Sequence, residues 1–450
     1  MLPDPAAGLP AGLTGPPPSV GPLPPHLLAD TARIGPTGRL VVGGIDVLDL
    51  CAELGTPVFV YDEEHLRTRC RQAVAAWGSG ATYASKAFWC RAMARLVAEE
   101  GLAADVSTAG ELHVALAGGL PPERLVLHGN NKSEGELAAA IDCGVGRIVV
   151  DSFDEIDRLE RLLAGGVPGP GGRGRPRALV RVTPGVEAHT HEYVRTGQED
   201  SKFGFGLASG AAAAAVARLR RRHSPVELVG LHIHIGSQIF ALDSFARALR
   251  LIADFAVPLD LPELSVGGGL GVGYVDGEPT PRIGDWAATV RTVVREAGWP
   301  EGIRLAAEPG RAIAASAALT AYTVGTVKEL PGIRTYVAVD GGMSDNPRPV
   351  LYDSGYEAFL PRVADAERPR VVTIVGKHCE SGDVIVRDAR LPADVAVGDI
   401  VATPVTGAYG HSMASTYNKV PRPPVVWVAG GAARTVVRRE TLDDLLALDL

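Results

Sequence analysis

Polar residues able to do chemistry stand at the ends of short apolar runs in the first two thirds of the chain. They are Lys86 after ATYAS, Asp105 in LAADV, His128 after RLVL, His234 in GLHIHIG, the glycines 267–269 after ELSV, and Glu308 after IRLAA. If the runs are parallel strands, their carboxyl ends meet at one rim. An amine, imidazoles, a glycine turn and carboxylates would then converge there.

Each of these residues alone has an ordinary structural interpretation. A lysine past a strand is usually solvated, and a glycine run can simply turn the chain. The pair His232 and His234 resembles a metal-binding pair, but no third ligand stands at a suitable spacing, so we expect no metal site. We expect His189 and His191, in EAHTHEY, to lie in a mobile loop, and 188–205 to be the segment that closes over the site.

The four residue types together match the needs of pyridoxal phosphate. A lysine amine such as Lys86 can form an imine with its aldehyde. An imidazole can stack on its ring, and the backbone N–H groups of a glycine turn can hold its phosphate. A carboxylate such as Glu308, facing the pyridine nitrogen, would keep that nitrogen protonated. A protonated ring is a strong electron sink, which suits decarboxylation.

The elements that must position these residues alternate between strand and helix. Strand-like runs from 57–61 to 303–308 are separated by amphipathic or alanine-rich segments such as 63–77 and 209–222. Eight or nine such units predict an α/β fold, a closed (β/α)₈ barrel over residues 57–311. The breaker-rich stretch 165–176 is expected to be a surface loop within it.

The pattern changes on both sides of the barrel. After residue 312 the runs are strand-like with turns between them, which predicts a second, all-β domain over 312–450. Within it, 441–448 is expected to form a helix capped by Thr441. The proline-rich segment 1–36 is expected to be a flexible tail, and 37–56 to pair with the β-domain.

Composition excludes several classes of protein. The 44 Lys and Arg against 52 Asp and Glu give a net charge of −8, which disfavours nucleic acid or an anionic membrane as partner. We expect no membrane span, because no apolar run is long enough. The five cysteines are too scattered for a disulfide framework, and no signal peptide is recognisable, so we expect a cytoplasmic protein with reduced thiols.

Longer motifs resemble one family, the pyridoxal-phosphate-dependent diaminopimelate decarboxylases, and in particular their actinobacterial form. The similarity runs in order from about residue 40 to the C-terminus. It is carried by YASKAF (83–88), HGNNKS (128–133), HEYVRTGQEDSKFGFGL (191–207), HIGSQI (234–239), GGGLG (267–271), EPGR (308–311), DGGMSDNPRPVLY (340–352), GKHCESGD (376–383) and GAYGHSMASTYN (407–418).

The resemblance implies a homodimer with shared active sites, which convert meso-diaminopimelate to L-lysine and CO₂. It makes Lys86 the residue that binds the cofactor covalently and Cys379, from the partner subunit, the proton donor. Further cofactor contacts are implied for Asp105, His128, His234, Ser237, Gly268, Gly269, Glu308, Pro309, Gly310, Arg311 and Tyr409. Substrate contacts are implied for Arg311, Arg348, Tyr352, Glu380 and Tyr409.

Three alternatives remain open at this stage. The substrate could be ornithine, arginine or carboxynorspermidine. Arg348 beside Glu380 favours instead a substrate whose far end carries both an ammonium group and a carboxylate. An amino-acid racemase on the same architecture is disfavoured by Glu308 and Cys379. A non-catalytic cofactor-binding protein is disfavoured by the β-domain that carries Cys379 and Tyr409.

Overall fold

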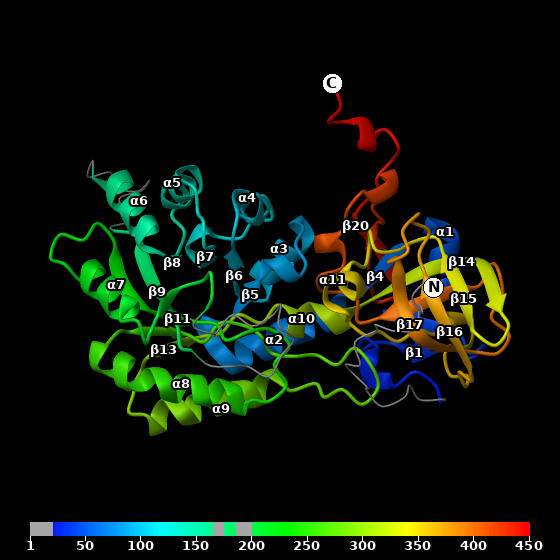
Figure 1. Cartoon of the computed structure of the whole chain (residues 1–450), viewed down its shortest axis with the longest axis horizontal. Helices are drawn as coiled ribbons and strands as arrows, with labels where there is room; N and C mark the ends of the chain where they lie inside the picture. The colour runs from blue at the N-terminus through cyan, green and yellow to red at the C-terminus, as the bar shows by residue number, and fades with distance from the viewer. Residues whose placement is uncertain (1–20, 165–174, 186–199) are drawn as a thin grey trace, which may run out of the picture.

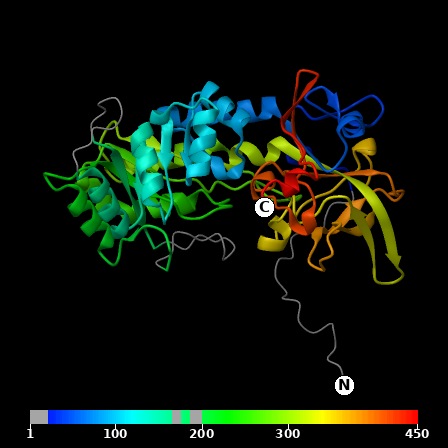
Figure 2. The ribbon, with the colours of Figure 1, turned by 90° about the horizontal axis from the view of Figure 1, so that it is seen from above.

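The chain folds into two bodies that lie side by side in a computed structural model describing residues 21–164, 175–185 and 200–450. Figure 1 shows an α/β body, cyan to green, beside a β-rich body, yellow to red. The N-terminal elements, in blue, pack against the β-rich body, and Figure 2 shows the same division from above.

The α/β body is the predicted barrel. Its eight strands pair in parallel, in the chain order β5 (Thr82–Ala84), β6 (Ala103–Val106), β7 (Leu125–Leu127), β8 (Arg147–Val150), β9 (Arg177–Thr183), β11 (Glu227–Ile233), β12 (Glu263–Ser265) and β13 (Arg304–Ala306). A parallel bridge between Ala81 and Ala307 closes the ring. A short β10 (Phe205–Gly206) adds to β9.

Helices surround the barrel, and three of them, α4, α5 and α6, begin at side-chain caps. Thr108 accepts from the N–H of Glu111 at the start of α4, and Ser133 and Glu136 form a capping box at α5. Each helix turns a buried face to the strands. The helices are α3 (Arg91–Glu99), α4 (Ala109–Ala117), α5 (Glu134–Cys143), α6 (Phe153–Leu163), α7 (Ala211–Leu219), α8 (Asp243–Ala256) and α9 (Ile283–Glu296).

The β-rich body is one eight-stranded sheet with the order β17-β16-β15-β14-β4-β19-β20, in which β18 also pairs with β14. The barrel reaches it through α10 (Arg311–Ala314), and its other helix is the short α11 (Arg348–Tyr352). Its strands are β14 (Ala318–Leu330), β15 (Arg334–Val339), β16 (Arg370–Val375), β17 (Val384–Leu391), β18 (Ile400–Pro404), β19 (Val425–Ala429) and β20 (Ala432–Val437).

The strand expected to begin the barrel belongs instead to this sheet. β4 (Val58–Asp62) lies between β14 and β19, antiparallel to the first and parallel to the second. All five of its residues are buried, so its sequence would suit a barrel strand equally well. The chain then crosses to the barrel along α2 (Glu63–Trp77), which Asp62 caps by accepting from the N–H groups of Glu64 and His65.

The expectation that residues 37–56 pair with the β-domain is also wrong in its detail. β1 (Arg33–Ile34), β2 (Leu40–Val42) and β3 (Ile45–Asp46) form a three-stranded sheet of their own, followed by α1 (Val47–Leu54). A hydrogen bond of 2.7 Å from Gly431 N to Gly43 O joins the turns of the two sheets. The segment therefore docks on the β-domain without extending its sheet.

Both ends of the chain differ from the sequence-based expectation. Residues 21–36 are ordered, because Leu23 and Leu27 are buried and Arg368 donates to Gly21 O at 3.0 Å. The first 20 residues lie outside the described part. At the other end, 441–448 forms only a 3₁₀ turn, Asp444–Leu446, although Thr441 Oγ1 does accept from Asp444 N at 3.1 Å. Leu442, Leu446 and Leu448 are exposed, so a longer helix would bury little apolar surface.

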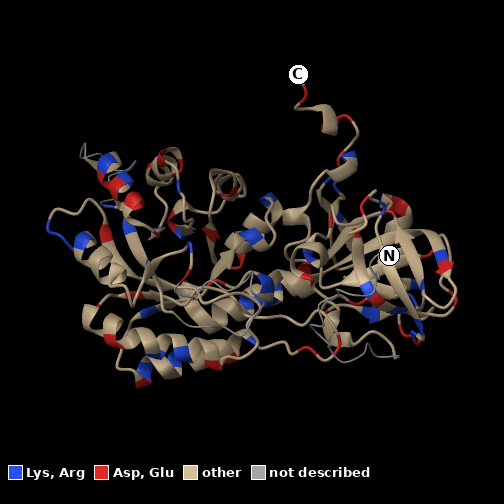
Figure 3. Ribbon diagram, in the orientation of Figure 1, with Lys and Arg blue, Asp and Glu red and all other residues tan. Residues whose placement is uncertain are grey.

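Acidic and basic residues are interspersed along the ribbon of both bodies in Figure 3. Among the described residues, no helix combines the length and the apolar character needed to cross a bilayer. Three sequence-based expectations fall mostly outside the described residues. They concern the loop at 165–176, the pair His189 and His191, and the segment 188–205 predicted to close over the site.

Candidate active site

A cavity of about 490 Å³ lies at the carboxyl ends of the barrel strands, where Tyr409 of the β-domain faces the barrel. The predicted convergence is confirmed here, because one cavity is lined by Lys86, Asp105, His128, His234, Ser237, Gly268, Gly269, Glu308, Pro309, Gly310, Arg311 and Tyr409. Its described lining does not include the other four predicted residues, Arg348, Tyr352, Cys379 and Glu380.

The backbone around Lys86 is fixed by hydrogen bonds, whereas its side-chain amine is exposed. It sits in a 3₁₀ turn, Ser85–Ala87, immediately after β5. The neighbouring Ala87 O accepts from Tyr409 N at 2.8 Å and from Ser412 Oγ at 3.0 Å, so the β-domain fixes the turn. Lys86 is exposed and is the sole lysine among the described residues lining the cavity. Its amine is therefore presented to a bound molecule.

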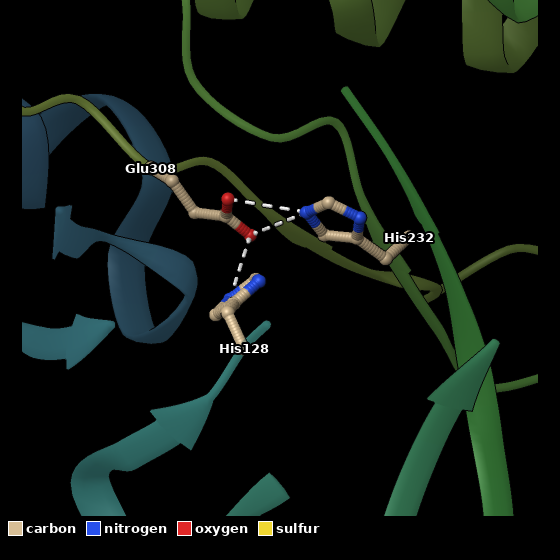
Figure 4. A group of neighbouring side chains, drawn as sticks. All are labelled: His128, His232 and Glu308. Carbon is tan, nitrogen blue, oxygen red and sulfur yellow. Dashed lines mark hydrogen bonds and ion pairs between the residues drawn. The ribbon is translucent and has the colours of Figure 1, made fainter. Parts of the chain in front are cut away.

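Glu308 is a buried carboxylate with donors on both oxygens. His232 Nε2 lies 3.1 Å from Oε2 (Figure 4). Ser265 Oγ donates to Oε1 at 2.6 Å. Burial alone would raise the pKa of Glu308, but His232, His128 and the Ser265 hydroxyl hold that pKa well below its usual range. The buried group therefore stays ionised.

Asp105 and His128 form the complementary neutral pair. His128 Nε2 lies 3.1 Å from Asp105 Oδ1 and 3.8 Å from Glu308 Oε1. Burial lowers the pKa of His128 to about 4, whereas burial and the Glu308 charge raise the pKa of Asp105 well above its usual range. Two carboxyl groups thus share one site with opposite protonation states, which is how enzymes assign acid and base roles.

The ring nitrogens of His128 and His232 and the oxygens of Glu308 lie within 4.8 Å of one another, a spacing that a metal ion could also use (Figure 4). The hydrogen bonds just described already give each of the three groups a partner without an ion. We therefore interpret the cluster as one ionised carboxylate flanked by two neutral imidazoles.

His234 and the glycine turn form another wall of the cavity. Gly268 N donates to His234 Nδ1 at 3.2 Å, and burial together with Lys86 lowers the pKa of His234 well below its usual range. Gly269 has φ +106°, and a Cβ there would lie 2.2 Å from Gly236 O. Only glycine fits this turn, which brings backbone amides to the cavity wall.

Arg311 connects the cavity to a second arginine. Its guanidinium donates to Ser237 Oγ at 3.1 Å and to Tyr274 Oη at 2.6 Å, and lies 4.6 Å from the centre of the Tyr409 ring. The Arg348 guanidinium stacks over the other part of this assembly, 4.1 Å from the centre of the Tyr274 ring.

Both arginines are buried without a negative partner. Arg348 donates to Tyr356 Oη at 2.6 Å, and the described residues place no carboxylate within 4.0 Å of either guanidinium. A buried cation without an anion is costly unless a bound anion completes the site. This corner is therefore suited to the carboxylate groups of a ligand.

The remaining predicted residues lie on the β-domain. Cys379 and Glu380 are exposed in the loop between β16 and β17. Tyr352 is half-buried at the end of α11. The structure thus separates these three residues from the cavity of their own chain.

Sequence reasoning missed four site residues: His232, Arg181, Tyr274 and Tyr356. Arg181 lines the cavity and lies 3.7 Å from Asp151. A charged residue within an otherwise buried strand was a signal for it, and the same holds for His232. The two tyrosines follow no pattern visible in the sequence, because they lie outside the strand ends.

These groups fit pyridoxal phosphate. An open amine, an ionised buried carboxylate, an imidazole and a glycine turn that has no room for a Cβ are what that cofactor requires. The barrel rim thus defines the class, a pyridoxal-phosphate enzyme of the barrel type.

The comparisons with known proteins support this class and narrow it. Residues 63–315 match the family model for the pyridoxal-binding domain of pyridoxal-dependent decarboxylases. Diaminopimelate decarboxylase of Mycobacterium tuberculosis is 48% identical over 92% of this chain and 95% of its own. That of Bacillus subtilis is 44% identical over 94% and 98%.

Solved structures agree with the sequence comparisons. The crystal structure of diaminopimelate decarboxylase from M. jannaschii has a TM-score of 0.85 and 31% identity, covering 94% of this chain and 98% of its own. The Helicobacter pylori enzyme complexed with L-lysine has a TM-score of 0.81 and 29% identity, covering 90% and 99%. The chain belongs to the diaminopimelate decarboxylase family.

Proposed function

We propose that this chain removes CO₂ from meso-diaminopimelate to give L-lysine, with pyridoxal phosphate as cofactor. The observation that carries the proposal is the pair Arg311 and Arg348, two buried guanidiniums without carboxylate partners among the described residues. Arg311 lines the same cavity as Lys86 and Glu308, and Arg348 stacks on Tyr274, to which Arg311 donates. An amino acid with a second carboxylate at its far end would supply the missing anions.

The cofactor, when bound, supplies a conjugated ring that accepts the electron pair left by a departing carboxylate. Toward it, the Lys86 amine is the group placed to bond its aldehyde carbon. Glu308 is placed to hold a proton at the pyridine nitrogen, since its carboxylate is kept ionised by His232 and Ser265. His234 offers a ring face. Backbone amides at Gly269 and Gly310, with Ser237, offer donors for the phosphate, and Gly268 lines the same wall while its N–H bonds His234.

The substrate end of the site is built from different groups. Arg311 and Arg348 can each bind a carboxylate with a forked pair of N–H donors, which fixes the far end and orients the bond to be broken. Tyr352 and Tyr409 are proposed to add phenol contacts. Glu380 is proposed to pair with the far ammonium group.

The proton that replaces CO₂ needs a donor, and we propose Cys379 of the partner subunit. Cys379 and Glu380 lie exposed outside their own cavity, and this separation supports a homodimer in which each β-domain completes the site of the other chain. We further propose that the protein works in the cytoplasm, where its cysteines, all free in the structure, stay reduced.

A substrate panel tests the proposal directly. Purified protein with pyridoxal phosphate should release CO₂ from the meso isomer and not from the L,L or D,D isomers, ornithine, arginine or carboxynorspermidine. Arg348→Ala should lose most of the activity while keeping the absorbance of the bound cofactor. Equal turnover of ornithine, or an unaffected Arg348→Ala variant, would contradict the proposed substrate.

A further inference from the structure

The loop that carries the cysteine, here the 376–383 loop, is fixed at its base by one carboxylate. Asp383 Oδ1 accepts from Met343 N at 2.7 Å, and Oδ2 accepts from His378 N at 2.9 Å. A Cβ at Gly376 would lie 2.2 Å from Asp383 Oδ2, so the backbone closes tightly around this group. The buried His378 ring meets Ser344 Oγ at 2.8 Å.

The tip of the loop is held differently. Cys379, Glu380 and Ser381 are exposed, and the carboxylate of Glu380 bonds only within the tip, to the Ser381 hydroxyl and Gly382 N. Among the described residues, the hydrogen bond that reaches Cys379 from outside the loop is Cys379 N to Asn418 Oδ1, at 3.1 Å. Asn418 has φ +52°, a conformation that asparagine tolerates better than most residues.

Asn418 ends a segment, here the 407–418 segment, whose other end lies beside Lys86. Tyr409 N and Ser412 Oγ both donate to Ala87 O, at 2.8 and 3.0 Å. Midway, Ser415 N donates to Ser344 O at 2.8 Å. One short stretch of chain is therefore bonded to the lysine turn of its own cavity and to the exposed cysteine that lies outside that cavity.

We propose that Asn418 is the positioning residue for Cys379, and that the 407–418 segment ties the proton donor offered to the partner subunit to the lysine turn of its own chain. This inference rests on the proposed function, in which Cys379 acts in the partner's site. An exposed hydrogen bond contributes little while water competes for both groups. Its effect is expected when the partner covers the loop and excludes that water.

Two variants at position 418 separate the effect of the side-chain hydrogen bond from the effect of the backbone conformation. Asn418→Gly removes the acceptor and keeps the positive φ without strain, whereas Asn418→Asp keeps an oxygen at the same place. Lys419→Gly is the matched control, because Lys419 has φ +56° and donates to Leu445 O instead. We expect Asn418→Gly to lower kcat by about tenfold or more with cofactor absorbance and unfolding temperature unchanged. Asn418→Asp should stay within about threefold of the parent.

Mixed dimers decide which site Asn418 serves. A Lys86→Ala chain combined with a Cys379→Ala chain forms one intact site, with Lys86 from the second chain and Cys379 from the first. Asn418→Gly added to the chain that supplies Cys379 should lower the remaining activity by about tenfold. The same change added to the chain that supplies Lys86 should leave that activity within about twofold.

A chemical readout is independent of turnover. In the wild-type holoenzyme, L-lysine bound in the cavity should slow the alkylation of Cys379 by iodoacetamide. Peptide mapping measures the extent of alkylation. In Asn418→Gly that protection should be largely lost, because the thiol no longer holds a fixed place against the ligand.

The outcomes are distinguishable. If the parent mixed dimer recovers no activity, the shared-site proposal fails and this inference fails with it. If it recovers activity but Asn418→Gly acts equally in either chain, or if Lys419→Gly matches Asn418→Gly, the shared site stands and the positioning role is refuted.

Discussion

The barrel rim and the 376–383 loop treat reactive groups in opposite ways. At the rim, Glu308 is buried with neutral donors on both oxygens, so its ionisation is settled within one chain. On the loop, Asp383 is enclosed at the base, but Cys379 stands exposed with one backbone bond to Asn418. The carboxylate at the rim has its hydrogen-bond donors within its own chain. The loop has a fixed base, but its tip is exposed and is expected to be covered by another surface. The contrast is the one that the proposed shared site requires, in which one chain holds the cofactor and a second chain delivers the proton.

The largest effect should come from the rim. Lys86→Ala is expected to lower activity on the order of 10³-fold or more, because no other lysine lines the described cavity. Borohydride reduction of the holoenzyme followed by peptide mapping should label Lys86. A label at another lysine would show that the rim is not the cofactor site.

The next effect tests the loop. Cys379→Ala should lower kcat by about 10²-fold or more, as for the loss of a general acid, with cofactor binding retained. Cys143→Ala, on α5 of the barrel, is the matched control and should match the parent. If Cys379→Ala keeps full activity, the loop has no chemical role and the comparison collapses.

A smaller effect should follow from the donor to Glu308. His232→Leu leaves a buried carboxylate with a missing donor, a cost of about 1–3 kcal/mol, or roughly a ten- to hundredfold loss in kcat/KM. His232→Gln, which can place an N–H near the same point, should recover much of it. The sharper measurement is the pH titration of bound-cofactor absorbance and the cofactor Kd. Unchanged values in His232→Leu would show that His232 only fills space.

The smallest effect on activity is expected beneath the loop. Burial raises the pKa of Asp345 to about 7, although Tyr322 Oη donates to it at 2.6 Å. The folded state therefore binds this proton more tightly than the unfolded state, and stability falls as pH rises from about 4 to 7. Asp345→Asn should abolish that fall, with a gain at pH 8 of up to about 4 kcal/mol at 1.36 kcal/mol per pKa unit. Thermal unfolding at pH 5 and pH 8 checks it, and an equal gain at both pH values would contradict the assignment.

The rim could be predicted from the sequence because its geometry follows from strand ends. Asp105, His128, His234 and Glu308 each stand at the end of a parallel strand, and closing the barrel brings such ends together. The same reasoning could not place β4, whose uniformly buried residues suit either sheet. It also missed His232, because a lone pattern of two histidines does not reveal that a glutamate 76 residues away faces one of them.

The far side of the site was less accessible to sequence reasoning for a different reason. Arg348 is connected to Arg311 through Tyr274, and these three residues come from the β-domain, the link between the bodies and the barrel. Contacts of that kind depend on how the two bodies pack against each other. The periodicity of apolar residues along the sequence does not predict this packing. The family motifs supplied Arg348, whereas Tyr274 and Tyr356 emerged only in three dimensions.

The position of β4 has a consequence for how the protein is made. Val60 pairs with Leu319 and Val426, so β4 cannot be paired on both sides until residue 426 has left the ribosome. The barrel, whose strands follow one another in order, can fold during synthesis while β4 waits unpaired. Late closure of the sheet would then bring the cysteine loop into place last, after the lysine turn to which it is tied already exists.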